Sequence, residues 1–276
     1  MKIYVMTDME GVAGVLNFPD WCSPGGRYYE LGKELLTEEV NAAVDGLFAG
    51  GATSVVVSDG HGGGGIHSHQ LDRRVEYLRG WPTGWPFLLD ESFDAVAFVG
   101  QHAKAGTPFA HLAHTQSCEY LDLSVNGVSI GEFGQFAMCA AELGVRTIFG
   151  SGDRAFCQEA RTLVPGIETV EVKRGTAPGS GDECSRAEYC DRNTAVIQMH
   201  PERAREAVRA GAERAVRRAG AEDFGIIPLE PPFECILRLR HTENRSRRRC
   251  VATHPSSVIA VMNQSLDQQR LEDESA

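Results

Sequence analysis

The sequence opens on MKIYVMTDMEG, residues Met1 to Gly11, and this stretch decides the fold. Its apolar, β-prone residues predict a short buried strand that runs directly into Asp8 and Glu10. Residues two apart in an extended chain face the same side, so both carboxylates can point to one place. Burying two acids there is costly unless a cation, a proton or a basic partner neutralises them. We therefore expect Asp8 and Glu10 to bind metal; the alternative is a turn at Asp8 and a solvated Glu10.

The composition is that of an ordinary globular protein. Of 276 residues, 42% are hydrophobic and 24% charged, and the formal net charge is −11. Such an acidic chain argues against nucleic acid or an anionic membrane as the main partner. No window approaches the roughly 18 apolar residues of a membrane span, and no apolar signal segment follows Lys2. We expect a cytoplasmic protein whose scattered cysteines, without a C-x-x-C pair, are reduced thiols.

The next elements indicate a parallel sheet. Helical spacing of apolar residues predicts a helix from Tyr28 to Phe48, and the β-branched run Thr53 to Val57 predicts a second strand. Strand, helix and strand in this order form a βαβ unit. Further strands are expected at Asp94 to Val99, Val145 to Phe149 and Glu168 to Val172. The predicted fold is α/β, with a mostly parallel sheet, helices on both faces and a smaller C-terminal α+β region.

We expect residues 1–175 to form the core and residues 176–276 to supply helical packing and oligomer contacts. Asn126-Gly127 predicts a hairpin turn after a strand at Tyr120 to Val125. Other expected elements are an irregular helical piece at His67 to Leu78, helices at Gly131 to Leu143 and Arg154 to Leu163, a helical stretch from Glu183 to Ala219 broken near Pro201, a strand at Phe233 to Leu239, a solvated basic loop or subunit contact at Arg245 to Arg249, and a helix at Val258 to Leu271.

Polar residues collect just beyond the predicted strand ends. In open α/β sheets this edge binds ligands. Carboxylates and imidazoles without a thiolate suit Zn²⁺, with Mn²⁺ or Co²⁺ as less favoured alternatives. There are more candidates than one tetrahedral catalytic ion needs, so two ions sharing a carboxylate would use them all. The candidates are Asp8, Glu10, His61, His102 and Glu132, with Asp59 expected to orient a ligand or cap a turn.

Several short motifs occur in a fixed order. They are Thr7-Asp8-Met9-Glu10-Gly11, Asp59-Gly60-His61-Gly62, Gly100-Gln101-His102-Ala103-Lys104-Ala105-Gly106-Thr107-Pro108, His114-Thr115, Asn126-Gly127, Gly131-Glu132-Phe133-Gly134 and Gly152-Asp153-Arg154. In this order and over about residues 1–175 the chain resembles the zinc-dependent D-aminopeptidases of the DppA type. The stretch Gly62 to His69 departs from that pattern.

The resemblance implies a role for each matching residue. Asp8, Glu10, His61, His102 and Glu132 would bind two zinc ions, with Asp8 between them. His114 would be the catalytic histidine beside the metals, and the nearby His111 is its competitor.

The resemblance also implies an activity. An N-terminal D-residue would be released from a short peptide or amino-acid amide, because two metal ions can activate a water molecule as hydroxide and polarise the scissile carbonyl. A homo-oligomeric ring enclosing the active sites would be expected.

Two alternatives stay open at this point. A two-metal site also permits hydrolysis of a phosphoester or a non-peptide amide. Phosphate chemistry would call for more basic residues than Lys104 near the site. A non-catalytic metal-binding homologue is the other alternative.

Overall fold

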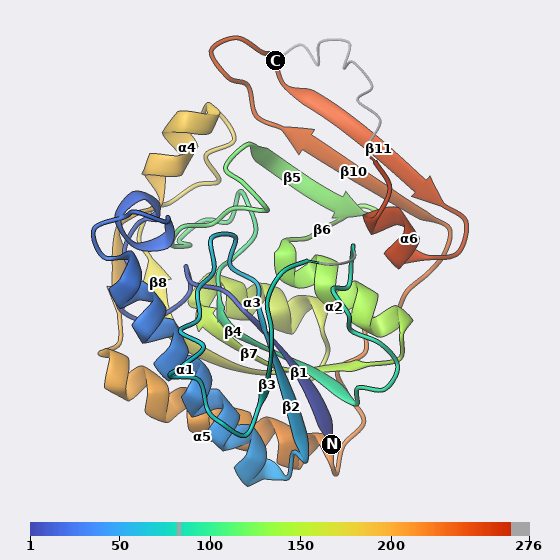
Figure 1. Cartoon of the computed structure of the whole chain (residues 1–276). Helices are drawn as coiled ribbons and strands as arrows, with labels where there is room; N and C mark the ends of the chain where they lie inside the picture. Colours follow the sequence, from blue (N-terminus) through green and yellow to red (C-terminus); the bar gives the residue numbers. More distant parts are fainter. Residues whose placement is uncertain (82–83, 266–276) are drawn as a thin grey trace.

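A seven-stranded sheet forms the centre of the chain (Figure 1), in a computed structural model that describes residues 1–81 and 84–265. Its strand order is β3-β2-β1-β4-β7-β8-β9, and all neighbours are parallel except β8 and β9. The strands are β1 (Lys2–Thr7), β2 (Ser54–Asp59), β3 (Glu76–Leu78), β4 (Ala95–Gln101), β7 (Arg146–Asp153), β8 (Glu168–Gly175) and β9 (Val196–Gln198). The predicted α/β class with a mostly parallel sheet is confirmed.

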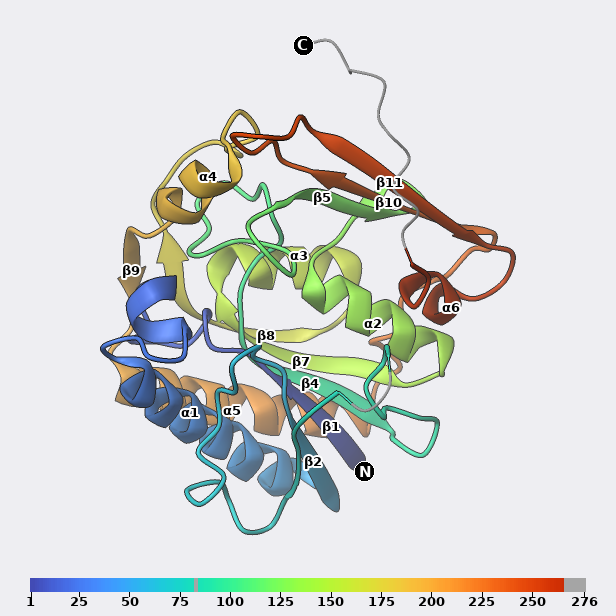
Figure 2. The same ribbon diagram turned by 45° about the horizontal axis from the view of Figure 1, so that its top comes forward.

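Helices cover both faces of this sheet. One face packs against α1 (Tyr29–Gly50) and α5 (Pro201–Ala219), and the other against α2 (Glu132–Glu142) and α3 (Arg154–Leu163). Two separate apolar cores follow, one on each face. Figures 1 and 2 show the two helical layers with the strands between them.

A second, antiparallel sheet packs over α2 and α3. It has the order β11-β10-β5-β6 and consists of β5 (Tyr120–Val125), β6 (Val128–Ser129), β10 (Phe233–Leu239) and β11 (Arg248–His254), with α6 (Val258–Met262) beside it. Asn126 and Gly127 have φ of 49° and 79°. Positive φ at both residues is what a tight hairpin turn requires, so the predicted hairpin is confirmed.

Two predicted elements in the middle of the chain differ from the structure. The stretch from His67 to Leu78 forms no helix and ends in β3. The stretch from Glu183 to Ala219 holds α4 (Arg186–Arg192), β9 and α5 rather than two helices, because Val196 to Gln198 pairs with the end of β8. The predicted break is confirmed, since α5 begins at Pro201.

The basic run near the C-terminal end also differs from its prediction. Arg248 and Arg249 begin β11 instead of lying in a solvated loop, because they pair with Leu239 and Arg238 of β10. The predicted final helix is shorter, since α6 ends at Met262. Residues from 266 onward lie outside the described part of the chain.

The cysteines are not all reduced thiols. Cys118 and Cys190 form a disulfide with a Cα–Cα distance of 5.6 Å, whereas Cys22, Cys139, Cys157, Cys184, Cys235 and Cys250 are free. The two bonded residues are 72 positions apart and belong to no spacing motif. The fold brings them together by placing α4 against the loop that precedes β5.

Residues beyond 175 take part in both layers of the molecule. The helix α5 packs against α1 and the parallel sheet, and β10 pairs with β5. The division into a core and a C-terminal region stays a prediction. Within residues 1–81 and 84–265, none of the helices combines the length and apolar character needed to cross a membrane.

Candidate metal centre

The site lies where β1 and β4 end side by side. From β1 the chain runs to β2 and β3 on one flank of the sheet and then crosses to β4 on the other flank, which makes this edge a topological switch point. The Asp8 amide donates to the Val99 carbonyl at 2.9 Å, and the Gly11 amide donates to the Gly100 carbonyl at 2.8 Å. Asp8 and His102 are therefore fixed next to each other by the backbone of two core strands.

Glycine permits this close approach. A Cβ on Gly11 would lie 2.1 Å from the Gln101 carbonyl oxygen, and one on Gly100 would lie 2.0 Å from the Asp8 carbonyl oxygen. Gly100 also has φ of +76°, which side chains with a Cβ rarely adopt. Glycine is therefore required at residues 11 and 100 because the ends of β1 and β4 lie so close together.

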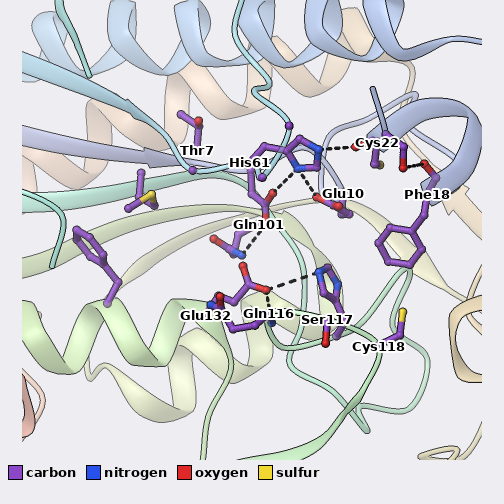
Figure 3. Close-up of a pocket in the computed structure, with 18 of the residues that line it drawn as sticks. Thr7, Glu10, Phe18, Cys22, His61, Gln101, Gln116, Ser117, Cys118 and Glu132 are labelled. Atoms are coloured by element: carbon purple, nitrogen blue, oxygen red, sulfur yellow. Dashed lines mark hydrogen bonds and ion pairs between the residues drawn. The ribbon is translucent and has the colours of Figure 1, made fainter. Parts of the chain in front are cut away.

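The first group of candidate ligands consists of Asp8, Glu10 and His61, all buried. His61 Nδ1 lies 3.2 Å from Asp8 Oδ1 and 3.3 Å from Glu10 Oε2. The spacing of two residues brings both acids to one imidazole, as the strand geometry predicts. Figure 3 shows Glu10 and His61 meeting on one side of the cavity, with Glu132 on the other side.

The second group consists of His102, His114 and Glu132. Glu132 Oε1 lies 3.6 Å from the Nε2 atoms of both histidines, whose rings stack at a centroid distance of 4.0 Å. In each group the candidate ligand atoms lie within 4.8 Å of one another. Asp8 Oδ2 is 3.1 Å from His102 Nε2, so this one carboxylate joins the two groups.

Each imidazole is oriented by a backbone carbonyl. His61 Nε2 lies 2.6 Å from the Cys22 oxygen, His102 Nδ1 lies 2.9 Å from the Ala103 oxygen, and His114 Nδ1 lies 2.9 Å from the Leu112 oxygen. The nitrogen that donates to the carbonyl leaves the other ring nitrogen facing the carboxylates, where a bound metal ion would replace its proton. This is how metal-binding histidines are held in proteins.

The donor set fits a pair of divalent metal ions. Glu10 Oε2 and His102 Nε2 are buried and make no well-aligned hydrogen bond among the described residues; each faces only the other members of the cluster, at 3.3 Å from His61 Nδ1 and 3.1 Å from Asp8 Oδ2. Buried polar atoms are rarely left in this state. Carboxylates and imidazoles together suit zinc. Residues from both groups and Asp8 between them would hold the ions.

The pKa values show how strongly the charges interact. Burial alone would raise the pKa of Asp8, but hydrogen bonds and charge from His102 and His61 hold it well below its usual range. Burial alone would lower the pKa of His61, but Glu10 and Asp8 raise it to about 12. The pKa of His102 is likewise raised against its burial, to about 10, by Glu132 and Asp8. The acids thus create a site that attracts positive charge.

The two neighbouring histidines differ in their surroundings. His114 lines the cavity, where the ring of Phe18 packs edge-on against it at 5.2 Å. His111 is fully buried and its Nε2 lies 3.0 Å from the Leu16 carbonyl oxygen. Burial, together with the charge of Lys173, lowers the pKa of His111 to about 3, so its imidazole is neutral. The geometry therefore favours His114 over its competitor.

Other residues shape the site without belonging to the predicted set. Gln101 Nε2 donates to Asp8 Oδ2 at 3.2 Å, a contact that the sequence did not reveal although Gln101 stands directly before His102. Asp59 accepts hydrogen bonds from the Gly65 amide at 2.8 Å and from the Tyr77 hydroxyl at 3.0 Å, so it fixes the loop that carries His61. Asp8, Glu10, His61, His114 and Glu132 line a cavity of about 610 Å³, whereas His102 lies behind its wall.

Comparison with known proteins identifies the family. Residues 1–255 match the D-aminopeptidase family M55, and the chain belongs to it. The chain is 31% identical over 179 residues to a D-aminopeptidase of Bacillus subtilis strain 168; the alignment covers 63% of this chain and 64% of the relative, which is less than two thirds of the relative's length.

One solved structure shares the fold. It is the Zn-dependent D-aminopeptidase DppA from Bacillus subtilis, described as a self-compartmentalizing protease. The TM-score is 0.79 at 20% identity, over 95% of this chain and 94% of that one. The resemblance inferred from the motifs is confirmed.

Proposed function

We propose that this protein is a dinuclear zinc aminopeptidase that releases an N-terminal D-amino acid from short peptides or amino-acid amides. The observation that carries the proposal is the convergence of two ligand groups on Asp8 at the cavity wall. Membership of the D-aminopeptidase family supports the reaction class, and the zinc dependence printed for the structural relative supports the metal.

The proposed ligands are Asp8, Glu10 and His61 for one ion and His102 and Glu132 for the other, with Asp8 shared. Two such ions, when bound, activate a water molecule and polarise the scissile carbonyl. Asp8 keeps one oxygen directed at each group, and Gln101 holds its Oδ2 in place. The side chains of both ligand groups are thereby held in position before substrate binds.

His114 has the position of a proton carrier. Its Nδ1 is held by the Leu112 carbonyl, so Nε2 is the atom free to take up a proton and deliver it to the leaving amine. The Nε2 atom lies 3.6 Å from Glu132 Oε1, so the ring faces the candidate metal centre. Phe18 packs against the ring and limits its rotation.

A phosphoester substrate fits the cavity poorly. Only one lysine or arginine, Arg186, is among the described residues that line it. Lys104, the basic residue nearest in sequence to the predicted ligands, does not line the cavity and donates to Ser129 at 2.8 Å. A dianionic phosphate would require more positive charge from the protein.

We further propose a homo-oligomer in which the C-terminal region supplies subunit contacts. The support is the description of the structural relative as self-compartmentalizing. A cytoplasmic location stays a prediction.

One experiment tests the central proposal. Purified protein is analysed for bound metal and then assayed on D- and L-aminoacyl amides and dipeptides, with and without a chelator. We expect about two zinc ions per chain, turnover of D-substrates and loss of activity that added zinc restores. Zinc-loaded protein without amide hydrolysis on the panel would refute the proposed function.

A further inference from the structure

The cavity has an apolar wall on one side of the candidate metal centre. We call this the aromatic wall; it consists of Met6, Trp81, Trp85, Phe87, Phe98 and Phe136. The ring of Phe87 lies 4.3 Å from Trp81, 4.6 Å from Trp85 and 6.4 Å from Phe136 between centroids. The Tyr4 hydroxyl donates to the Phe87 carbonyl at 2.8 Å and ties this segment to β1.

One arginine, and no lysine, is among the described residues that line the cavity. Arg186 is the first residue of α4, and its guanidinium makes no hydrogen bond or ion pair with the residues that the structure describes. Cys190, one helical turn later, is bonded to Cys118, and both also line the cavity. The disulfide thus anchors the helix that presents Arg186.

The two features lie on opposite sides of the site. Figures 1 and 2 both show α4 on one side of the strand ends and α2, which carries Phe136, on the other. The candidate ligands that directly follow β1, β2 and β4 lie between them. A bound molecule that spans the cavity would meet an apolar surface at one end and an arginine at the other.

We propose that the cavity binds short peptides with a bulky apolar N-terminal residue and a free C-terminal carboxylate. The aromatic wall takes the N-terminal side chain and Arg186 pairs with the carboxylate. This inference rests on the proposed function, because the two ends of the peptide are assigned relative to a scissile bond at the metal centre.

The direction of the peptide follows from its chemistry. In aminopeptidase cleavage the first residue lies on one side of the scissile amide, and the C-terminal carboxylate leaves with the product on the other side. Among the described residues that line the cavity, Arg186 is the one lysine or arginine, and its guanidinium matches the two oxygens of a carboxylate. The first side chain is then directed toward the aromatic wall. A cavity of about 610 Å³ has room for a dipeptide or tripeptide.

The first test compares substrates on the metal-loaded enzyme. We expect kcat/KM for D-Phe-Gly to exceed that for D-Ala-Gly by about tenfold or more, because a buried aromatic side chain adds apolar contact. We expect D-Phe-Gly to exceed its C-terminal amide by about tenfold, the usual effect of one hydrogen bond to a charged group. Equal rates within each pair would overturn the proposal.

Two variants assign each preference to its residue. Arg186→Gln should abolish the preference for the free acid and leave the preference for D-Phe intact. Trp81→Ala should lower the preference for D-Phe and leave the acid preference intact; Trp81 is 39% exposed, so its truncation should not disrupt the core. An unchanged acid preference in the first variant, or an unchanged D-Phe preference in the second, would contradict its assignment.

Matched controls are available outside the cavity. Arg203→Gln removes an exposed arginine from the surface of α5, and Leu88→Ala removes a side chain that is 49% exposed on the same segment as Phe87 but outside the cavity lining. Both controls should keep both preferences. A control that loses either one would show that the effect comes from net charge or segment stability, and the proposal would fall.

A binding measurement separates this inference from the proposed function. Reduced-amide analogues of D-Phe-Gly, its C-terminal amide and D-Ala-Gly, which cannot be hydrolysed, are titrated into wild type and Arg186→Gln by calorimetry. Selective binding that depends on Arg186, without turnover of any peptide, would refute the aminopeptidase and retain the recognition. If the peptides are hydrolysed but affinities and kcat/KM values are equal across the series, the aminopeptidase stands and the proposed recognition is refuted. If there is neither turnover nor binding, both are refuted.

Discussion

At the scale of single residues, one carboxylate organises the centre. Asp8 presents Oδ1 to His61 and Oδ2 to His102, at 3.2 and 3.1 Å. It is 6% exposed and accepts a further hydrogen bond from the Met9 amide at 2.8 Å, so it cannot turn away. Any change at Asp8 therefore affects both ligand groups at once, whereas Glu10 and Glu132 each belong to one.

His114→Ala tests the proposed proton carrier. We expect kcat to fall about 100-fold or more, the usual effect of losing general acid–base catalysis, while the zinc content stays unchanged. Steady-state kinetics and metal analysis of the same preparation measure both. Loss of one zinc ion would make His114 a ligand, and unchanged turnover would remove it from the mechanism.

Sequence reasoning selected the candidate ligand residues because strand geometry relates them. The spacing of Asp8 and Glu10 and the positions just beyond strand ends are visible in the sequence, and the structure brings all five candidates together. Gln101 was not singled out, because a glutamine after a strand has no distinctive chemistry. The aromatic wall was also missed: Trp81, Trp85 and Phe87 lie in a segment without helix or strand periodicity.

At the scale of elements, the candidate metal centre depends on the close approach of the chain at the ends of β1 and β4. Gly11→Ala would place a Cβ against the Gln101 carbonyl, and the backbone beside Glu10 and His102 would have to move. We expect a loss of about 2 kcal/mol in the free energy of unfolding, as for other overpacked positions, and weaker zinc retention. Denaturant unfolding and metal analysis measure the two effects.

Gly62→Ala serves as the control for this substitution. A Cβ at Gly62 meets nothing within 4 Å, so its stability should stay within about 0.5 kcal/mol of wild type. A Gly11→Ala protein as stable as this control would show that the strand ends tolerate a wider spacing.

The contact between α1 and the loop after β1 predicts a pH dependence. Glu39 on α1 is 1% exposed and accepts a hydrogen bond from the Ala13 amide at 3.4 Å; burial raises its pKa to about 7. Between pH 4.5 and 7 the folded protein binds this proton and the unfolded chain does not. Glu39 therefore reduces stability as pH rises through this window, by about 3 kcal/mol in full.

Glu39→Gln should remove this component. We expect the variant to gain stability over wild type at pH 8 and to lose that gain at pH 4.5, because a neutral amide resembles the protonated acid. Chemical unfolding at both pH values measures the difference. An equal difference at the two pH values would show that Glu39 is not the group that titrates.

Strands with a clear local pattern could be predicted from the sequence, whereas strands that form only by pairing with a distant strand could not. Tyr120 to Val125 and Phe233 to Leu239 were placed correctly because their apolar alternation is clear. The short strand β9 (Val196–Gln198) was missed because it lies within a longer stretch of helix-favouring sequence, and β11 was missed because it begins with charged residues; pairing with β8 and β10 decides both. Local sequence does not indicate which strand will pair with the edge of a sheet.

At the scale of the whole molecule, the proposed oligomer has a direct measurement. Light scattering coupled to size exclusion should give a mass several times the 30.0 kDa of the chain. We expect this mass to persist at high salt if apolar contacts dominate, because salt screens only exposed charges. A clean monomer at working concentrations would contradict the oligomer and leave the aminopeptidase proposal standing.

The disulfide between Cys118 and Cys190 should hold the protein together after a protease cuts the segment between β8 and α4. The segment between β8 and α4 is exposed at Pro178 and Gly179, where a protease would cut first. The two resulting fragments would remain covalently joined, since one bonded cysteine lies in each. Nicked protein should therefore run as a single full-size band on a denaturing gel without reductant and split into two bands after dithiothreitol. Two bands in both lanes would show that the crosslink is absent in solution.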